Sequence, residues 1–76
     1  MIADLTFGGA LEHIKADSDC RMSRVGWNGK DQYIYLHKAT TDIHVDFLMI
    51  RTSSGKLGPY VASNCDTLAT DWHILP

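Results

Sequence analysis

Apolar residues near the start of the chain recur with the spacing of an α-helix. Within residues 5–17 they stand at three- and four-residue steps: Phe7, Ala10, Leu11 and Ile14. This spacing places side chains on one face of a helix. Thr6 supplies the side-chain oxygen that a helix N-cap requires. We therefore predict one substantial helix over residues 5–17.

The remainder of the chain shows strand patterns separated by turn residues. We expect strands at residues 20–25, 33–37, 45–52, 60–62 and 71–75, and turns or loops at 39–46, 53–56 and 58–59. In the segment 33–37, rings alternate with Ile34 and Leu36. One face of that strand should therefore be buried, while the ring-bearing face is a candidate binding surface.

A short helix is predicted just before the last strand. Ser63 and Asp66 have the spacing of a capping box, with Ser63 as N-cap and Asp66 at the third helical position, and they open a single-turn helix over 64–69. These elements describe a single α+β domain over residues 1–76. We expect its N-terminal helix to pack on a small, curved antiparallel sheet, with the one-turn helix before the last strand.

Residues 26–30, Gly-Trp-Asn-Gly-Lys, lie between the first two expected strands. Asn-Gly favours a type I′ turn, because both residues tolerate positive φ, so the segment predicts a tight hairpin. A Trp beside such a turn is commonly half exposed. Trp27 is therefore a candidate binding ring, and packing in the core is the competing interpretation.

Composition and charge narrow the classes of partner. Seven Lys and Arg against nine Asp and Glu give a net charge of −2, which lacks the positive field that duplex nucleic acid requires. A small anion remains a suitable ligand, because one cation or a group of backbone N–H groups suffices to bind it. A chain of 76 residues buries only a small core, so we expect oligomerisation to contribute to its stability.

No segment predicts a membrane span, a signal peptide, a metal site or a cofactor. Cys20 and Cys65 stand alone in sequence, and the four His residues lack ligand spacing. Asp66 and Asp71 are better explained as a helix-capping acid and a turn acid than as paired catalytic carboxylates. A hydrolase needs a nucleophile or metal site that the sequence does not supply, so binding chemistry is favoured over catalysis.

Groups suited to a nucleotide lie around two turns. The rings of Trp27 and Tyr60 are suited to stack on a base, with core packing as the alternative. The amides of Asn28 and Asn64 are suited to a base edge or ribose hydroxyls, and a turn former or first-turn helix residue is their structural role. The nearby cations suited to a phosphate are Arg24, Lys30 and Arg51.

Motifs over nearly the whole chain resemble one phage family. They are Phe-Gly-x-Ala-Leu-Glu at 7–12, Arg-Val-Gly-Trp-Asn-Gly-Lys at 24–30, Met-x-Arg-Thr at 49–52 with a glycine turn through 55, Pro-Tyr-Val-Ala-Ser-Asn at 59–64, and Asp66, Leu68-Ala69 and Asp71-Trp72. In this combination the chain resembles the Thoeris anti-defence sponges of phages and prophages, second type. Some relatives are anti-CRISPR proteins that act on Cas9.

The resemblance implies a non-enzymatic homo-oligomer, a tetramer built as a dimer of dimers, in the cytoplasm of the infected bacterial host. Such a protein captures cyclic ADP-ribose isomers made by TIR-domain defence enzymes, and some members bind cyclic dinucleotides. The defence effector then stays inactive. The alternative hypothesis is an inhibitor that binds Cas9 or another effector protein directly.

The expected ligand-binding residues are Arg24, Trp27, Asn28, Gly29, Lys30, Arg51, Pro59, Tyr60, Ser63, Asn64 and Asp66. We expect a base to stack on Trp27 or Tyr60. We expect the diphosphate to meet backbone N–H groups near Ser63, together with Lys30 or Arg51. The two turn segments should face each other, within one chain or across an interface.

The chain departs from the family pattern at three places. Tyr60 stands where the family usually has Trp, and Asn64 stands where it usually has Gln. The loop 39–46 is short beside that of many relatives. These differences bear on the identity of the ligand more than on the fold.

Overall fold

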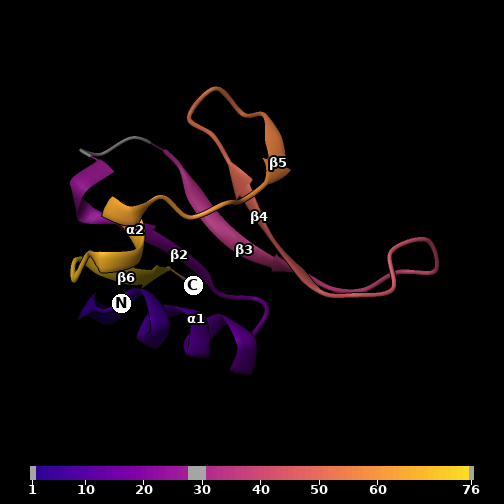
Figure 1. Ribbon diagram of the computed structural model, residues 1–76, viewed down its shortest axis with the longest axis horizontal. Helices are drawn as coiled ribbons and strands as arrows, with labels where there is room; N and C mark the ends of the chain where they lie inside the picture. Colours follow the sequence, from indigo (N-terminus) through magenta and orange to yellow (C-terminus); the bar gives the residue numbers. More distant parts are fainter. Residues whose placement is uncertain (1, 28–30, 76) are drawn as a thin grey trace.

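The computed structural model describes residues 2–27 and 31–75. Its elements, in chain order, are β1 (Ile2–Leu5), α1 (Phe7–Ala16), β2 (Arg21–Arg24), the 3₁₀ turn η1 (Val25–Trp27), β3 (Tyr33–His37), β4 (Phe47–Arg51), β5 (Leu57–Pro59), α2 (Asn64–Leu68) and β6 (Trp72–Leu75). The strands form one antiparallel sheet in the order β1-β6-β2-β3-β4-β5, and α1 packs against β6, β2 and β3 (Figure 1). The predicted α+β fold is confirmed.

Helix α1 begins where the sequence places its cap. The side-chain oxygen of Thr6 accepts a hydrogen bond of 3.0 Å from the backbone N–H of Gly9, which satisfies one of the unpaired donors of the first turn. Ala10 and Ile14 are buried on the face toward the sheet. Within the described ranges, no helix has the length and apolar character needed to cross a membrane.

The residues before α1 form a strand that the sequence pattern does not predict. Strand β1 pairs with β6 at the edge of the sheet, and its register shifts between Ile2 and Leu5. Asp4 lies within this irregularity at a positive φ of 60°, which is uncommon for a residue other than glycine. A four-residue strand with a broken register shows no regular alternation, so it escapes a periodicity argument.

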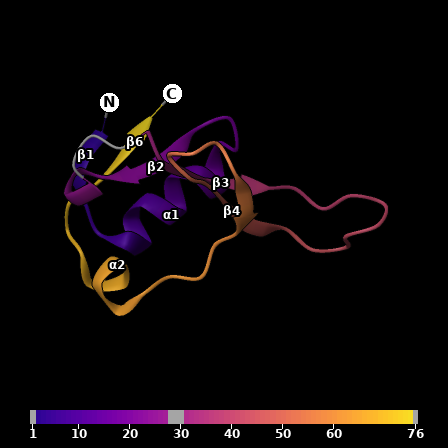
Figure 2. The ribbon, with the colours of Figure 1, turned by 90° about the horizontal axis from the view of Figure 1, so that it is seen from above.

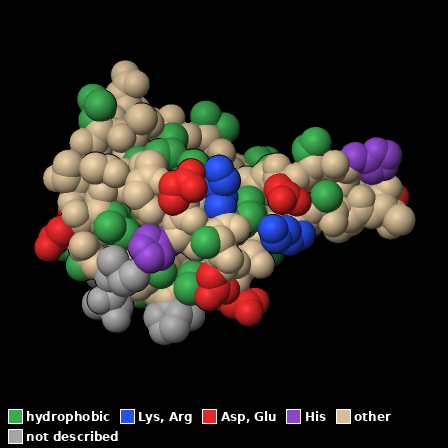
Figure 3. Space-filling view, turned by 90° about the horizontal axis from the view of Figure 1, so that it is seen from below, with side chains coloured by type: hydrophobic (Ala, Val, Ile, Leu, Met, Phe, Trp, Pro, Cys, Tyr) green, Lys and Arg blue, Asp and Glu red, His purple; other side chains and the backbone are tan. Residues whose placement is uncertain are grey.

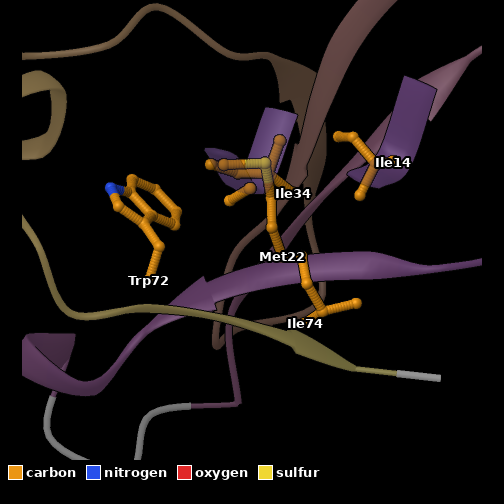
Figure 4. Packing of buried hydrophobic residues seen from close by; sticks show 6 residues of the cluster. Ile14, Met22, Ile34, Trp72 and Ile74 are labelled. Carbon is orange, nitrogen blue, oxygen red and sulfur yellow. The ribbon is translucent and has the colours of Figure 1, made fainter. Parts of the chain in front are cut away.

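The core lies between α1 and the three strands it covers. Met22 on β2 is in register with Ile34 on one neighbouring strand and with Ile74 on the other. In Figure 4 these side chains lie between Trp72 and Ile14, and all five belong to one buried cluster with 0–5% exposure. Burying each large apolar side chain stabilises the fold by roughly 1.5–3 kcal/mol. The core therefore holds α1, β2, β3 and β6 together.

The opposite face of the sheet has no helix over it in the described residues. Tyr33, Tyr35 and His37 alternate with the core-facing residues of β3, and they pair across to Arg51, Met49 and Phe47 of β4. The rings of Tyr33 and Tyr35 are 6.1 Å apart, and those of His37 and Phe47 stack at 4.8 Å. The prediction that β3 buries Ile34 and turns its rings to the other face is confirmed. We call this ring-bearing surface the open face.

Residues 38–46 project from the body of the molecule as an arm (Figures 1 and 2). Every residue of the arm is exposed. Its own contacts order it: the N–H of Ala39 donates to the Asp46 carboxylate at 2.7 Å, and the N–H of Thr40 donates to the Ile43 carbonyl at 2.6 Å. The predicted loop at 39–46 is therefore confirmed.

The last third of the sheet differs from the prediction. The strand expected at 60–62 and the turn expected at 58–59 are wrong, because residues 57–59 form β5 against β4. Pro59 is tolerated there, since β5 is an edge strand and one side of it needs no backbone donor. The turn at 53–56 is confirmed, with Gly55 at a φ of 86°.

The connection between β2 and β3 is longer than the predicted hairpin. Strand β2 ends at Arg24, and residues 25–27 form η1 instead of continuing the pairing with β3. The reason is that the N–H groups of Val25 and Gly26 donate to the carbonyl and the carboxylate of Asp71. Asn28, Gly29 and Lys30 lie outside the described residues.

Candidate functional site

Arg24 joins the two turn segments at the end of β2. Its Nε donates to Asp71 Oδ1 and its Nη1 donates to Asp66 Oδ1, each at 2.8 Å. The hydroxyl of Tyr60 donates to the other oxygen of Asp66, also at 2.8 Å. We call these four residues the Arg24 network. Its charged side chains are 16–32% exposed, so solvent screens them less than a surface pair.

Helix α2 brings Asp66 into this network. Ser63 is the N-cap, and its Oγ accepts a hydrogen bond of 3.2 Å from the N–H of Asp66. The Ser63 half of the predicted capping box is thus confirmed. Asp66 itself is not the capping acid expected, because its carboxylate turns to Arg24 and Tyr60. The indole N–H of Trp72 donates to the Asp66 carbonyl at 2.9 Å and fixes the helix further.

The network shifts the pKa values of its members in the directions that favour the ion pairs. Partial burial opposes ionisation of Asp66, but hydrogen bonds from Arg24 and Tyr60 outweigh it, and the pKa is lowered. The hydrogen bond that Arg24 donates to Asp71 lowers the pKa of Asp71 and raises the pKa of Arg24. Burial raises the pKa of Tyr60. The guanidinium of Arg24 is therefore matched by two carboxylates, which leaves it poorly placed to meet a phosphate.

Gly26 has a packing role that its place in a turn motif conceals. Its N–H donates to Asp71 Oδ2 at 2.7 Å. A Cβ at this position would lie 2.9 Å from both Arg24 Nη2 and Asp71 Oδ2, which is closer than real Cβ atoms approach such neighbours. The absence of a side chain lets the backbone of η1 lie against the ion pair. No sequence pattern indicates this contact, because the two residues are 45 positions apart.

Four rings form a row across the helix side of the sheet. Trp27 meets Trp72 edge-on at 5.4 Å, Trp72 meets Phe7 at 5.4 Å, and Phe7 meets Tyr60 at 6.5 Å between centroids. Trp72 is fully buried, whereas Trp27 and Tyr60 at the two ends are half-buried. Trp72 therefore packs in the core. The two turn segments therefore lie at the ends of one aromatic row in a single chain.

The other predicted residues do not all join this row. Arg51 lies on the open face, where its Nη1 is 3.3 Å from Asp31 Oδ2 and its guanidinium lies over the Tyr33 ring. The side chain of Arg51 projects to the face opposite the row, so within one chain it does not lie beside the backbone N–H groups near Ser63.

Three further predicted contacts lie at the outer edge of the fold. Pro59 is on the edge strand β5, and Asn64 is exposed at the first position of α2. The phosphate contact expected at the start of α2 is weakened, because Ser63 Oγ already accepts from the N–H of Asp66 and the helix has only 5 residues. Asn28, Gly29 and Lys30 are in the segment that the structure does not describe.

A hollow of about 470 Å³ opens on the open face, between β6, β2 and β3. Arg21, Tyr33 and His73 line it, together with Ser23, residues 24–25 and residues 31–32. We call it the Tyr33 hollow. Arg24 is the one predicted site residue among its lining. The alternation of β3 indicated a ring-bearing face, but it could not show that Arg21 and His73 from other strands share it.

Charge is evenly spread on the α1 side of the molecule. In Figure 3 acidic and basic side chains are interspersed over that face and form no field of a single sign. Among the described residues, no three His, Cys, Asp or Glu side chains come together as a metal site. This side of the molecule therefore lacks the continuous positive surface on which nucleic-acid backbones are bound.

Comparisons with known proteins place the chain in a family. The model of the Thoeris anti-defense 2-like domain matches residues 5–75. The chain is also 31% identical over 91 aligned positions, covering 99% of both chains, to Thoeris anti-defense 2 of Bacillus phage SP01. Because this alignment is longer than the 76-residue chain, the relative carries insertions that this chain lacks. The chain therefore belongs to the Thoeris anti-defense 2-like family of phage anti-defence proteins.

Proposed function

We propose that this protein binds a cyclic ADP-ribose-type immune signal and holds it without degrading it, so that the Thoeris effector is not activated. Cyclic dinucleotides are a second ligand class of the same chemistry. Membership of the anti-defence family supports the biological setting. The observation that carries the ligand class is the aromatic row, which ends in the half-exposed rings of Trp27 and Tyr60.

Stacking on these rings is the main interaction in the proposal. A base stacked on an aromatic side chain contributes about 1–3 kcal/mol. Trp27 is held in place before the ligand arrives, by its edge contact with Trp72 and by the hydrogen bonds from η1 to Asp71. A ligand that meets a fixed ring loses less free energy to ordering on binding. We propose that the amides of Asn28 and Asn64 read its polar edges and that Lys30 meets a phosphate.

Binding and chemical integrity of the ligand are the two quantities to measure. We expect calorimetry to detect micromolar or tighter binding of a cyclic ADP-ribose isomer, and Trp27→Ala to abolish it while the circular dichroism spectrum is unchanged. Tyr33→Ala is the matched control, because it removes a half-buried ring from the opposite face of the sheet. Ligand recovered from denatured protein should be chemically unchanged. Absence of binding across a panel of isomers and cyclic dinucleotides would refute the proposal.

We further propose that the protein works as a homo-oligomer, a tetramer built as a dimer of dimers. A chain of 76 residues buries a small core. The end of the open face that carries Tyr35, Met49 and Phe47 is half-buried and has no covering element in the described residues. A second copy on this surface would bury these side chains. Light scattering on a sizing column should give the tetramer mass, and a monomer at micromolar concentration would contradict the proposal.

One observation favours direct inhibition of an effector protein as the second candidate. The arm 38–46 is ordered by its own hydrogen bonds and exposes Ile43 and Val45 away from the body of the molecule. An arm of this kind can enter a groove on a partner protein. Direct inhibition predicts a stable complex with Cas9 on a sizing column without any small molecule, which Ile43→Ser and Val45→Ser should weaken. A mixture that elutes as two separate species would exclude it.

A further inference from the structure

Tyr60 is the half-buried ring at one end of the aromatic row, and regular secondary structure does not hold it. Residues 60–63 lie between β5 and α2 and belong to neither a helix nor a strand. The backbone N–H of Tyr60 donates to the Leu48 carbonyl at 2.9 Å. The next side chain, Val61, is 86% exposed, so it does not anchor the segment. The orientation of the Tyr60 ring therefore depends on the contacts of its own side chain.

The Tyr60 side chain is held by a ring contact and by a hydrogen bond. The Phe7 ring lies 6.5 Å from it between centroids, with 33° between the ring planes. At the far end of the side chain, the hydroxyl donates to Asp66 Oδ2 at 2.8 Å. Burial, and then this hydrogen bond, raises the pKa of Tyr60, so the hydroxyl keeps its proton and remains a donor at neutral pH. Contacts along the ring and at its tip together fix its orientation.

Asp66 is itself fixed by its neighbours. Arg24 Nη1 donates to Asp66 Oδ1 at 2.8 Å, and the indole N–H of Trp72 donates to the Asp66 carbonyl at 2.9 Å. Ser63 Oγ accepts from the Asp66 N–H at 3.2 Å. The Asp66 side chain is only 16% exposed, and its two oxygens already accept from Arg24 and Tyr60. This carboxylate is therefore better placed to act through Tyr60 than to contact a ligand.

The same network reaches the other end of the aromatic row. Arg24 Nε donates to Asp71 Oδ1 at 2.8 Å, and Asp71 Oδ2 accepts from the N–H of Gly26 at 2.7 Å. Gly26 directly precedes Trp27 in η1. The Arg24 network therefore connects the Tyr60 hydroxyl with the backbone of the segment that carries Trp27.

From these contacts we infer that Asp66 is a positioning residue of the ligand site, which holds the Tyr60 ring in a fixed place relative to Trp27. The inference rests on the function proposed above, and it adds a residue that acts through Tyr60 without touching the ligand. Because the hydroxyl of Tyr60 is engaged by Asp66, the ring offers its face for stacking. A ring that is ordered before the ligand arrives costs less free energy to order on binding.

Calorimetry with the cyclic ADP-ribose isomer that the wild-type protein binds most tightly tests this inference. Tyr60→Phe keeps the ring and every charge but removes the hydroxyl. It should weaken binding about three- to tenfold, because the released ring must then be ordered by the ligand. In an Asp66→Ala background the hydroxyl has no acceptor, so Tyr60→Phe should change the affinity there by less than about twofold. Tyr33→Phe removes a hydroxyl from the open face and, as the control, should leave the affinity unchanged.

Equal weakening by Tyr60→Phe in both backgrounds would overturn the inference, because the hydroxyl would then contact the ligand directly. If Asp66→Ala does not fold, proton NMR of the wild-type protein supplies the test. The Tyr60 hydroxyl proton should exchange slowly with water, and its signal should persist when the ligand saturates the site. Loss of that signal on binding, or wild-type affinity in Tyr60→Phe, would also overturn the inference. Absence of binding by the wild-type protein is a different outcome, which refutes the proposed function and this inference with it.

Discussion

Replacement of Arg24 by Met tests whether the Arg24 network holds the two turn segments together. Met has a comparable length but no charge and no donor, so Asp66 and Asp71 lose their common partner. The side chain of Asp66 is only 16% exposed. It would then hold a carboxylate in a partly buried site without a cation, an arrangement that costs far more than losing an exposed pair.

The expected magnitude follows from the two hydrogen bonds of 2.8 Å. A hydrogen bond to a charged group contributes about 1.5–3 kcal/mol net, and breaking a fully buried pair costs about 3–5 kcal/mol. Partial exposure reduces both figures, so we expect Arg24→Met to lower the free energy of unfolding by about 3 kcal/mol. A 76-residue domain has a total of roughly 4–11 kcal/mol. The melting temperature should fall by about 12–24 °C.

Thermal and urea unfolding followed by circular dichroism measure this loss. Lys15→Met is the control, because Lys15 and Glu12 form an ion pair whose side chains are 55% and 74% exposed. Its effect should stay within about 0.5 kcal/mol. Arg24→Lys keeps the charge without the forked donor geometry and should fall between the two. A melting temperature for Arg24→Met equal to that of Lys15→Met would refute the structural role of the network.

Two further predictions concern the same network. Gly26→Ala should lower the free energy of unfolding in urea by about 1–3 kcal/mol, because its Cβ would lie 2.9 Å from Arg24 and Asp71 atoms. Gly8→Ala, whose added Cβ would meet no atom within 4 Å, should raise the free energy of unfolding by up to about 1 kcal/mol. Equal urea midpoints for the two variants would contradict the close packing of Gly26 against Arg24 and Asp71. The lowered pKa values of Asp66 and Asp71 predict stability that is complete above their ordinary value of 3.8 and is lost as the pH falls through the lowered values. A urea midpoint that does not change from about pH 6 to about pH 2 would rule this out.

Local pattern predicted the elements whose side chains repeat regularly. The apolar spacing of residues 7–14 and the Thr6 cap define α1, and the alternation at 33–37 defines β3. The elements it misplaced, β1 and β5, are short edge strands. Their residues pair on one side only, so the neighbouring strand and not the residues' own alternation determines where they begin and end.

The candidate site shows a similar division. Sequence and family resemblance predicted Trp27, Tyr60 and Asp66 as ligand-binding residues, and in the structure they lie around one aromatic row and one ion-pair network. The sequence did not show that Arg24 is paired with two carboxylates, or that Arg51 lies on the other face of the sheet. Each of these facts depends on which strands are neighbours, and a single chain pattern does not contain that information.

The amino-acid sequence by itself determined the fold class, the main helix with its cap, the central strands and the family of this protein. The tertiary structure alone decided the roles of individual charges. Arg24 meets Asp66 and Asp71 across 42 and 47 positions of the chain, and Arg21, Tyr33 and His73 share a hollow because three strands align in register. Helix and strand periodicity is a property of neighbouring residues, whereas an ion pair or a binding surface forms only where folding brings distant residues together.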